Sequence, residues 1–148
     1  MKAIIFDLDG TLVDSAPGIL SAFARAFSAC GLEPVVPLVP GVIGPPLRDT
    51  LRYLAGVADL HVLDRLTAAF KAHYDSSDYL ETQPFPGVET MLATLANAGL
   101  DLHVATNKRD FPTRRILAHL GWTTLFGRVY ALDTFNPPLP GKAALLAR

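Results

Sequence analysis

Asp7 and Asp9 are separated by a single residue, at the point where an apolar run over residues 2–7 ends. Two carboxylates at this spacing can face one site as the backbone leaves its pleat, and carboxylate oxygens are ligands for a hard cation such as Mg²⁺. One carboxylate can also act as a nucleophile while the other moves protons. Gly10 permits a sharp turn, which we expect to leave backbone N–H groups free to meet an anion. The pattern predicts carboxylate chemistry on an anion, with a plain Asp-Gly turn as the alternative.

The chain around these carboxylates predicts an α/β fold. Residues 2–7 are expected to form a strand that is buried on both faces. Ser15 is expected to cap the next helix, and apolar residues at helical spacing predict further helices over 47–55 and 60–74. Because the stretch from 16 to 83 contains no convincing strand, we expect it to form a helical lid inserted into a sheet domain.

Strands and helices alternate in the second half of the chain. Residues 100–105 and 129–132 predict two more strands, and alternation with helices is typical of a parallel sheet with right-handed crossovers. Ligands of such sheets bind beyond the carboxyl ends of the strands. We therefore expect Asp7, Thr106 and Asp133 to line the same edge of the sheet.

The predicted domain organisation is a core of residues 1–15 and 84–148, interrupted by a cap of residues 16–83. The final helix begins near Lys142 and reaches Arg148 after barely two turns, and three strands make a small sheet with an unprotected edge. We expect that the C-terminal part of the core is missing from this chain. A small domain completed by oligomerisation is the alternative, and the sequence leaves the oligomeric state open.

The composition argues against several classes of partner. The chain has 13 Lys and Arg against 14 Asp and Glu, and a net charge of −1 gives no long-range attraction to nucleic acid or anionic lipid. No apolar run approaches the roughly 20 residues that span a bilayer, and the N-terminus is unlike a signal peptide. The one cysteine, Cys30, cannot form an intramolecular disulfide, which fits a reducing compartment. We expect a cytoplasmic protein without nucleic-acid or membrane partners.

The segment around the two carboxylates resembles a known family motif. Residues 6–15 read FDLDGTLVDS, which is similar to the first motif of the haloacid dehalogenase superfamily, particularly its phosphoglycolate-phosphatase-like branch. The resemblance extends to the helix start at 86–88, to residues 104–108 and to the strand that ends at Asp133. It implies a Rossmann-like parallel-sheet core with an inserted all-α cap of the C1 type.

The resemblance implies roles for individual residues. Asp7 is expected to attack phosphorus and form an aspartyl-phosphate, and Asp9 to protonate the leaving oxygen and later activate water. Dehalogenases of the family lack this second Asp, so Asp9 favours phosphoryl chemistry. Thr106 matches the Ser or Thr that hydrogen-bonds the transferring phosphoryl group, with Asn107 beside it. The turn residues Gly10 and Thr11, together with Asn107, are expected to contact the substrate.

A lysine that neutralises charge on the nucleophile is also implied. Lys142 is the candidate, because it stands at a helix start after a Pro-rich loop, although relatives often carry a Lys-Pro pair that is absent here. Lys108 is the rival, and we interpret it as a substrate-side or structural residue. The expected Mg²⁺ ligands are Asp7 and the backbone carbonyl of Asp9, and the acidic residues that complete the family's metal site have no match. Waters are expected to fill the remaining positions.

The loop over residues 41–48 resembles the substrate loop of the family's cap. Arg48 is expected to meet a substrate carboxylate or second anionic group, with a solvated helix residue as the alternative. The leading hypothesis is a Mg²⁺-dependent phosphatase of a small phosphorylated metabolite such as phosphoglycolate. A sugar phosphomutase of the same fold and a catalytically incomplete fragment are the alternatives.

Overall fold

Three short strands form a parallel sheet in the order β1-β4-β5. A computed structural model describes residues 2–135 and 146–147. In it, β1 (Ala3–Phe6) pairs with β4 (Asp101–Ala105), which pairs in turn with β5 (Arg128–Tyr130). The parallel pairing confirms the predicted α/β class, and β4 and β5 begin within one residue of the expected positions.

The first strand is less buried than its apolar sequence predicts. Ile4 and Phe6 pack against the hydrophobic cluster of the sheet, but Ile5, which points to the other face, is 52% exposed. β1 stands at the edge of the described sheet and pairs with β4 alone. The prediction that this strand is buried on both faces is therefore wrong for the described chain, because no described element covers the outer face at Ile5.

The sheet and two helices, α4 (Val88–Asn97) and α5 (Asp110–His119), share one hydrophobic cluster. Its buried members come from the loop after β1, from both helices, from β4 and from the turn after α5: Leu8, Leu12, Val13, Val88, Leu92, Leu102, Val104, Leu117, Trp122 and Phe126. The three strands, the two helices and the loops between them are called here the sheet block. The cluster packs these elements together and helps to hold the carboxyl ends of β1 and β4 beside each other.

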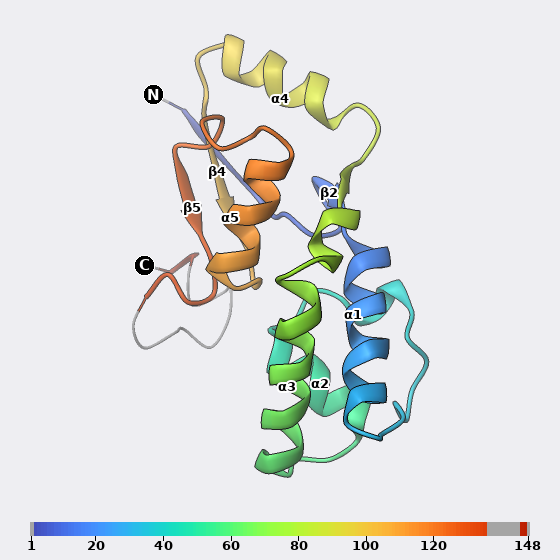
Figure 1. Ribbon diagram of the computed structural model, residues 1–148. Coiled ribbons are helices and arrows are strands. Elements are labelled where there is room, and N and C mark those ends of the chain that lie inside the picture. Colours follow the sequence, from blue (N-terminus) through green and yellow to red (C-terminus); the bar gives the residue numbers. More distant parts are fainter. Residues whose placement is uncertain (1, 136–145, 148) are drawn as a thin grey trace.

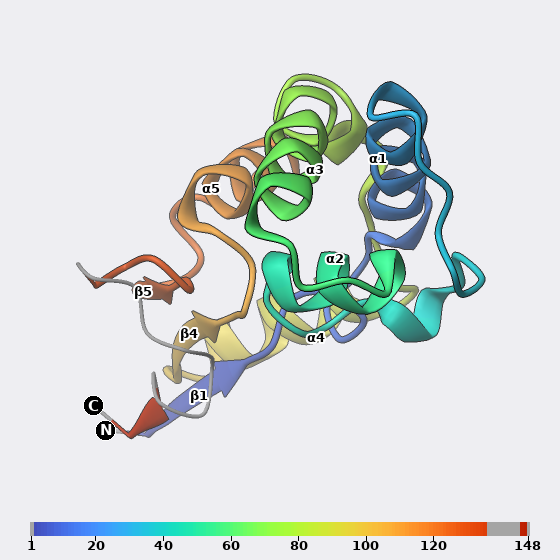
Figure 2. The same ribbon diagram turned by 90° about the horizontal axis from the view of Figure 1, so that it is seen from below.

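A second hydrophobic cluster is formed mainly by three helices, and Ile116 of α5 also contributes to it. α1 (Ala16–Ala29), α2 (Leu47–Ala55) and α3 (Leu60–Tyr74) pack together below the sheet block in Figure 1, with the short 3-10 turns η1 (Pro40–Val42) and η2 (Asp78–Glu81). We call this group the helical block. Figure 2 shows it to one side of the three strands. The predicted bounds of α2 and α3 are confirmed. None of the helices in the described chain has both the length and the apolar character that a bilayer crossing requires.

Two very short strands join the blocks. β2 (Val13–Asp14) and β3 (Gln83–Pro84) pair antiparallel, so the chain enters and leaves the helical block side by side. Two-residue strands carry no periodicity, which is why the sequence did not predict them. Ser15 does precede α1, but its hydroxyl makes no capping bond. The hydroxyl instead donates to Oδ1 of Asp9 at 2.6 Å, so the predicted cap is wrong and the side chain supports the carboxylate.

Gly18 lets α1 approach η2 closely. A Cβ atom at this position would overlap the backbone carbonyl oxygen of Asp78, and a backbone atom cannot rotate away. The close contact matters for the loop that carries Asp7 and Asp9, called here the carboxylate loop. η2 leads into β3, and β3 pairs with β2, which follows this loop.

Gly18→Ala is expected to lower the free energy of unfolding by about 1–3 kcal/mol, the usual cost of overpacking. Because the overlap is with a backbone atom, we expect a cost at the upper end of this range, which exceeds the gain of about 1 kcal/mol that Ala brings to a helix interior. Urea denaturation followed by circular dichroism measures the change. Ser28→Ala, at an exposed position of the same helix, is the matched control and should shift stability by less than about 0.5 kcal/mol. A Gly18→Ala variant as stable as the parent would contradict the close approach.

Candidate active site

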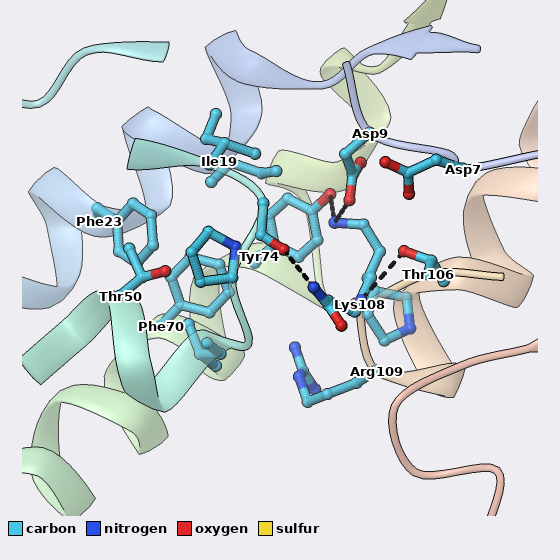
Figure 3. Close-up of a pocket in the computed structure, with 16 residues that line it drawn as sticks. Asp7, Asp9, Ile19, Phe23, Thr50, Phe70, Tyr74, Thr106, Lys108 and Arg109 are labelled. Atoms are coloured by element: carbon cyan, nitrogen blue, oxygen red, sulfur yellow. Dashed lines mark hydrogen bonds and ion pairs between the residues drawn. The ribbon is translucent and has the colours of Figure 1, made fainter. Parts of the chain in front are cut away.

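A cavity lies where the carboxyl ends of β1 and β4 meet the helical block (Figure 3). The sheet block contributes mainly polar side chains to its lining: Asp7, Asp9, Thr106, Asn107, Lys108, Arg109 and Pro112. Asp7 and Asp9 follow β1, and the run from Thr106 to Arg109 follows β4. The structure thus brings together four of the residues that the sequence predicted for one site: Asp7, Asp9, Thr106 and Asn107.

The loop after β1 closes on itself. The backbone carbonyl of Leu8 accepts the N–H groups of Thr11, Leu12 and Val13 at 2.9–3.2 Å. Gly10 has a φ of +77°, and its own N–H donates to the carbonyl of Val13 at 2.9 Å. The amides of Gly10 and Thr11 are thus bonded within the turn, so these two do not supply the free N–H groups that we expected for an anion. Neither residue lines the cavity.

Both carboxylates are held by donors. Oδ1 of Asp7 accepts the N–H of Leu8 at 2.9 Å. Oδ1 of Asp9 accepts the hydroxyl of Ser15, and its Oδ2 lies 3.2 Å from Nζ of Lys108. The two side chains of the Asp9–Lys108 pair are only 11% and 8% exposed, so this ion pair is shielded from water. Asp9 is consequently fixed in orientation at the cavity wall.

Lys108 also binds the helical block. Its Nζ donates to the hydroxyl of Tyr74 at 2.9 Å and lies 4.5 Å from the centre of that ring. Burial alone would lower the pKa of Lys108, but the charge of Asp9 and the contacts with Tyr74 outweigh it and raise the pKa above its usual value. Burial in turn raises the pKa of Tyr74. At neutral pH Lys108 is therefore charged and Tyr74 is neutral, as the bonding pattern requires.

Residues 107–109 contact the helical block at three separate points. Nδ2 of Asn107 donates to the carbonyl of Gly44 at 2.9 Å, and Lys108 reaches Tyr74. The guanidinium of Arg109 donates to both carboxylate oxygens of Asp75, at 2.6 and 2.8 Å. The N–H of Lys108 also donates to Oγ1 of Thr106, the buried residue that the sequence placed at the phosphoryl group.

Sequence reasoning missed two of these residues. Tyr74 was predicted only as an apolar member of its helix, and Arg109 was not singled out. Each makes its contact across 34 residues of sequence, so no local pattern identifies the pair. Lys108 was noted because it directly follows the Thr-Asn pair, and the structure shows that its ammonium group contacts Asp9.

Arg48 and Asp133 also lie outside this group. Nη1 of Arg48 lies 2.6 Å from Oδ1 of Asp64, both side chains are substantially exposed, and Arg48 is not among the residues that line the cavity. Asp133 stands in a turn after β5, at the expected edge of the sheet, where its Oδ1 accepts the N–H of Asp110 at the start of α5, and it is not among the residues that line the cavity. Lys142, the predicted charge-neutralising lysine, lies outside the described residues.

The described oxygen donors are compatible with Mg²⁺ but few. The carboxylate of Asp7 faces the cavity, and Asp9 follows two residues later on the same turn, with its backbone carbonyl as a further donor. In the part of the chain that the structure describes, no three His, Cys, Asp or Glu residues gather as a metal-binding group. Mg²⁺ commonly keeps several waters and binds through one or two carboxylates plus substrate phosphate oxygens. The donor set therefore suits Mg²⁺ held partly by water and substrate.

Known proteins match the chain over almost its whole length. A family model described as "Haloacid dehalogenase-like hydrolase" matches residues 4–147. A phosphoglycolate phosphatase of Xylella fastidiosa is 34% identical over 149 residues, which cover 98% of this chain and 64% of that protein. The tyrosine-protein kinase PtkA of Mycobacterium tuberculosis is 40% identical over 121 residues, which cover 81% of this chain and 40% of the kinase. The chain thus spans less than two thirds of the length of either relative.

A solved structure agrees with the fold. A haloacid dehalogenase-like hydrolase of Streptococcus pneumoniae matches with a TM-score of 0.83 and 28% identity, over 99% of this chain and 67% of that one. The likeness covers both the sheet block and the helical block, since nearly the whole chain is aligned.

Lys108→Met is expected to lower the free energy of unfolding by about 3 kcal/mol or more, because it leaves the shielded Asp9 carboxylate without its cation. Lys71→Met is the matched control, because it removes a lysine charge at an exposed position of α3. It should change the free energy of unfolding by less than about 0.5 kcal/mol. Chemical denaturation of both variants measures the difference. Equal stability of the two variants would contradict the importance of the ion pair.

Tyr74→Phe alone and combined with Lys108→Met completes a double-mutant cycle. A coupling energy of about 0.5–3 kcal/mol is expected for two side chains in direct contact. Strict additivity of the two changes would show that the bond between the blocks contributes nothing.

Proposed function

The chain belongs to the haloacid dehalogenase-like hydrolase family, and from this we propose that it is a Mg²⁺-dependent phosphohydrolase that uses Asp7 as its nucleophile. The convergence of Asp7, Asp9 and Thr106 at one wall of one cavity carries the proposal. A nucleophile, a proton-transfer group and a hydroxyl donor are the parts that phosphoryl transfer through an enzyme-bound phosphate needs.

The chemistry has two steps. An oxygen of Asp7 bonds to phosphorus while the ester P–O bond breaks, and Asp9 gives a proton to the departing oxygen. Water then attacks phosphorus, Asp9 takes its proton, and the bond between phosphorus and Asp7 breaks to release phosphate. Ser15 and Lys108 donate to the two oxygens of Asp9 and hold it in its ionised form, which is the form that accepts a proton from water in the second step. The first step begins from the protonated form of Asp9.

In this proposal, positive charges stabilise the negative charge on the phosphoryl oxygens. Mg²⁺ held by Asp7 and the backbone carbonyl of Asp9 would neutralise charge on the phosphoryl oxygens. Lys142 keeps the role that the sequence predicts, as a second neutralising charge. The hydroxyl of Thr106 is positioned by the N–H of Lys108 and can donate its proton to a phosphoryl oxygen.

The helical block serves as the cap in this proposal. We assign residues 16–83 to the cap and residues 1–15 and 84–148 to the core, since β2 and β3 bring the two ends of the cap together. Caps that cover a site exclude water and choose the substrate. A small phosphorylated metabolite is the proposed substrate. Phosphoglycolate is the first compound to test, because several relatives at 33–34% identity are named phosphoglycolate phosphatase.

Asp7→Asn is expected to reduce phosphate release from phosphomonoesters by on the order of 10³-fold or more, because an amide is a poor nucleophile toward phosphorus. Asp14→Asn is the matched control, since Asp14 is exposed, lies on the adjoining β2 and is not in the cavity. Phosphate assays on the full chain measure both rates. Full activity of the Asp7→Asn variant would contradict the proposal that Asp7 is the nucleophile.

Removal of divalent metal by EDTA is expected to abolish phosphate release, and added Mg²⁺ to restore it, because developing charge on the phosphoryl oxygens would lose its counter-ion. Phosphate release at increasing Mg²⁺ concentration, measured after dialysis against EDTA, follows the recovery. Undiminished turnover in EDTA would remove Mg²⁺ from the proposed mechanism.

A further inference from the structure

The cavity has two walls of different chemistry. The helical block lines its side with apolar groups, and Figure 3 shows Ile19, Phe23 and Phe70 facing the carboxylates across the cavity. These three side chains are 6%, 3% and 5% exposed, so the cavity is an indentation of the helical block's hydrophobic cluster. Ile43 and Leu47 are half-buried and continue the apolar wall.

The polar side chains that the helical block adds to this wall are already bonded. The hydroxyl of Thr50 donates to the carbonyl of Pro46 at 3.4 Å, and the hydroxyl of Tyr74 accepts from Lys108. The described side chains of the apolar wall therefore offer no charged donor to a ligand.

The cations that line the described cavity are committed to protein carboxylates. Lys108 pairs with Asp9, and Arg109 makes a two-point bond with Asp75. Arg48, which the sequence predicted as the partner of a substrate anion, pairs with Asp64 outside the cavity. A second negative charge on a substrate would thus face apolar side chains, or would have to displace one of these carboxylates.

We propose that this site selects phosphomonoesters whose leaving group is an apolar, uncharged alcohol, alkyl or aryl, over phosphomonoesters whose leaving group carries a carboxylate. The inference rests on the proposed phosphatase function and names its substrate class. A buried carboxylate without a partner loses its hydration uncompensated, whereas an apolar group gains by leaving water. The apolar wall therefore discriminates against a carboxylate, so phosphoglycolate, the first compound to test for phosphatase activity, should be a poorer substrate than an uncharged ester.

Binding of unreactive phosphonates tests the selectivity without turnover. Butylphosphonate and 3-phosphonopropionate are similar in length and differ by an apolar end against a carboxylate. Titration calorimetry of the full chain with Mg²⁺ is expected to show butylphosphonate binding about tenfold tighter or more. Inorganic phosphate, titrated in parallel, reports on the phosphoryl site alone.

The outcomes separate the two proposals. Equal or tighter binding of 3-phosphonopropionate, with phosphate still binding, overturns the selectivity and leaves the phosphatase proposal standing. Absence of binding by phosphate and by both phosphonates overturns the phosphatase proposal and the selectivity together.

A charge placed on the apolar wall should reverse the preference. Ile43→Lys is expected to weaken butylphosphonate binding and strengthen 3-phosphonopropionate binding, moving their affinity ratio by about tenfold or more. Pro45→Lys, at an exposed position that also lines the cavity, gives the same test if the Ile43→Lys variant fails to fold. Val39→Lys is the matched control, because Val39 is exposed in the same loop and does not line the cavity. Unchanged ratios in the folded Ile43→Lys and Pro45→Lys variants would overturn the role of the wall.

Discussion

The shielded ion pair between Lys108 and Asp9 is the constraint on which the site depends. Lys108 follows β4 and Asp9 follows β1, so their attraction joins the loops that leave the two paired strands. The same ammonium group bonds the hydroxyl of Tyr74 at the end of α3. A cation removed from water in this way needs all its partners, because each one compensates part of the lost hydration. One side chain thereby joins the sheet, the carboxylate loop and the helical block.

The two neighbours of Lys108 extend this junction. Asn107 bonds the loop that precedes α2, and Arg109 bonds the residue that follows α3. Three consecutive residues after one strand therefore set where the helical block lies over the carboxylates. The two hydrophobic clusters stabilise the blocks and meet at α5, whose Ile116 belongs to the cluster of the helical block, and the polar contacts add directional bonds between the blocks. Such directional bonds define the shape of the cavity more sharply than non-directional apolar packing does.

The cavity combines a polar wall from the sheet block with an apolar wall from the helical block. The polar wall is the part that resembles the family, because the Asp7, Asp9 and Thr106 positions follow from its motifs. The apolar wall comes from side chains that also form the helical block's own core. The shape of the cavity is thus coupled to the packing of that core, since a change at Phe23 or Phe70 alters both.

The sequence by itself determined the parallel α/β class, the bounds of α2 and α3, and the presence of Asp7, Asp9 and Thr106 at one sheet edge. These features follow from local periodicity and from the rule that parallel strands share their carboxyl edge. Only the tertiary structure decided that Lys108 meets Tyr74, that Arg48 lies outside the cavity lining, that the amide of Gly10 is bonded within its own turn, and that Ile5 is exposed. The contact of Lys108 with Tyr74 and the position of Arg48 depend on packing between residues distant in sequence. The bond of the Gly10 amide depends on how the turn after β1 closes, and the exposure of Ile5 depends on which elements flank β1. The pattern of apolar and polar residues in the sequence specifies none of these four features.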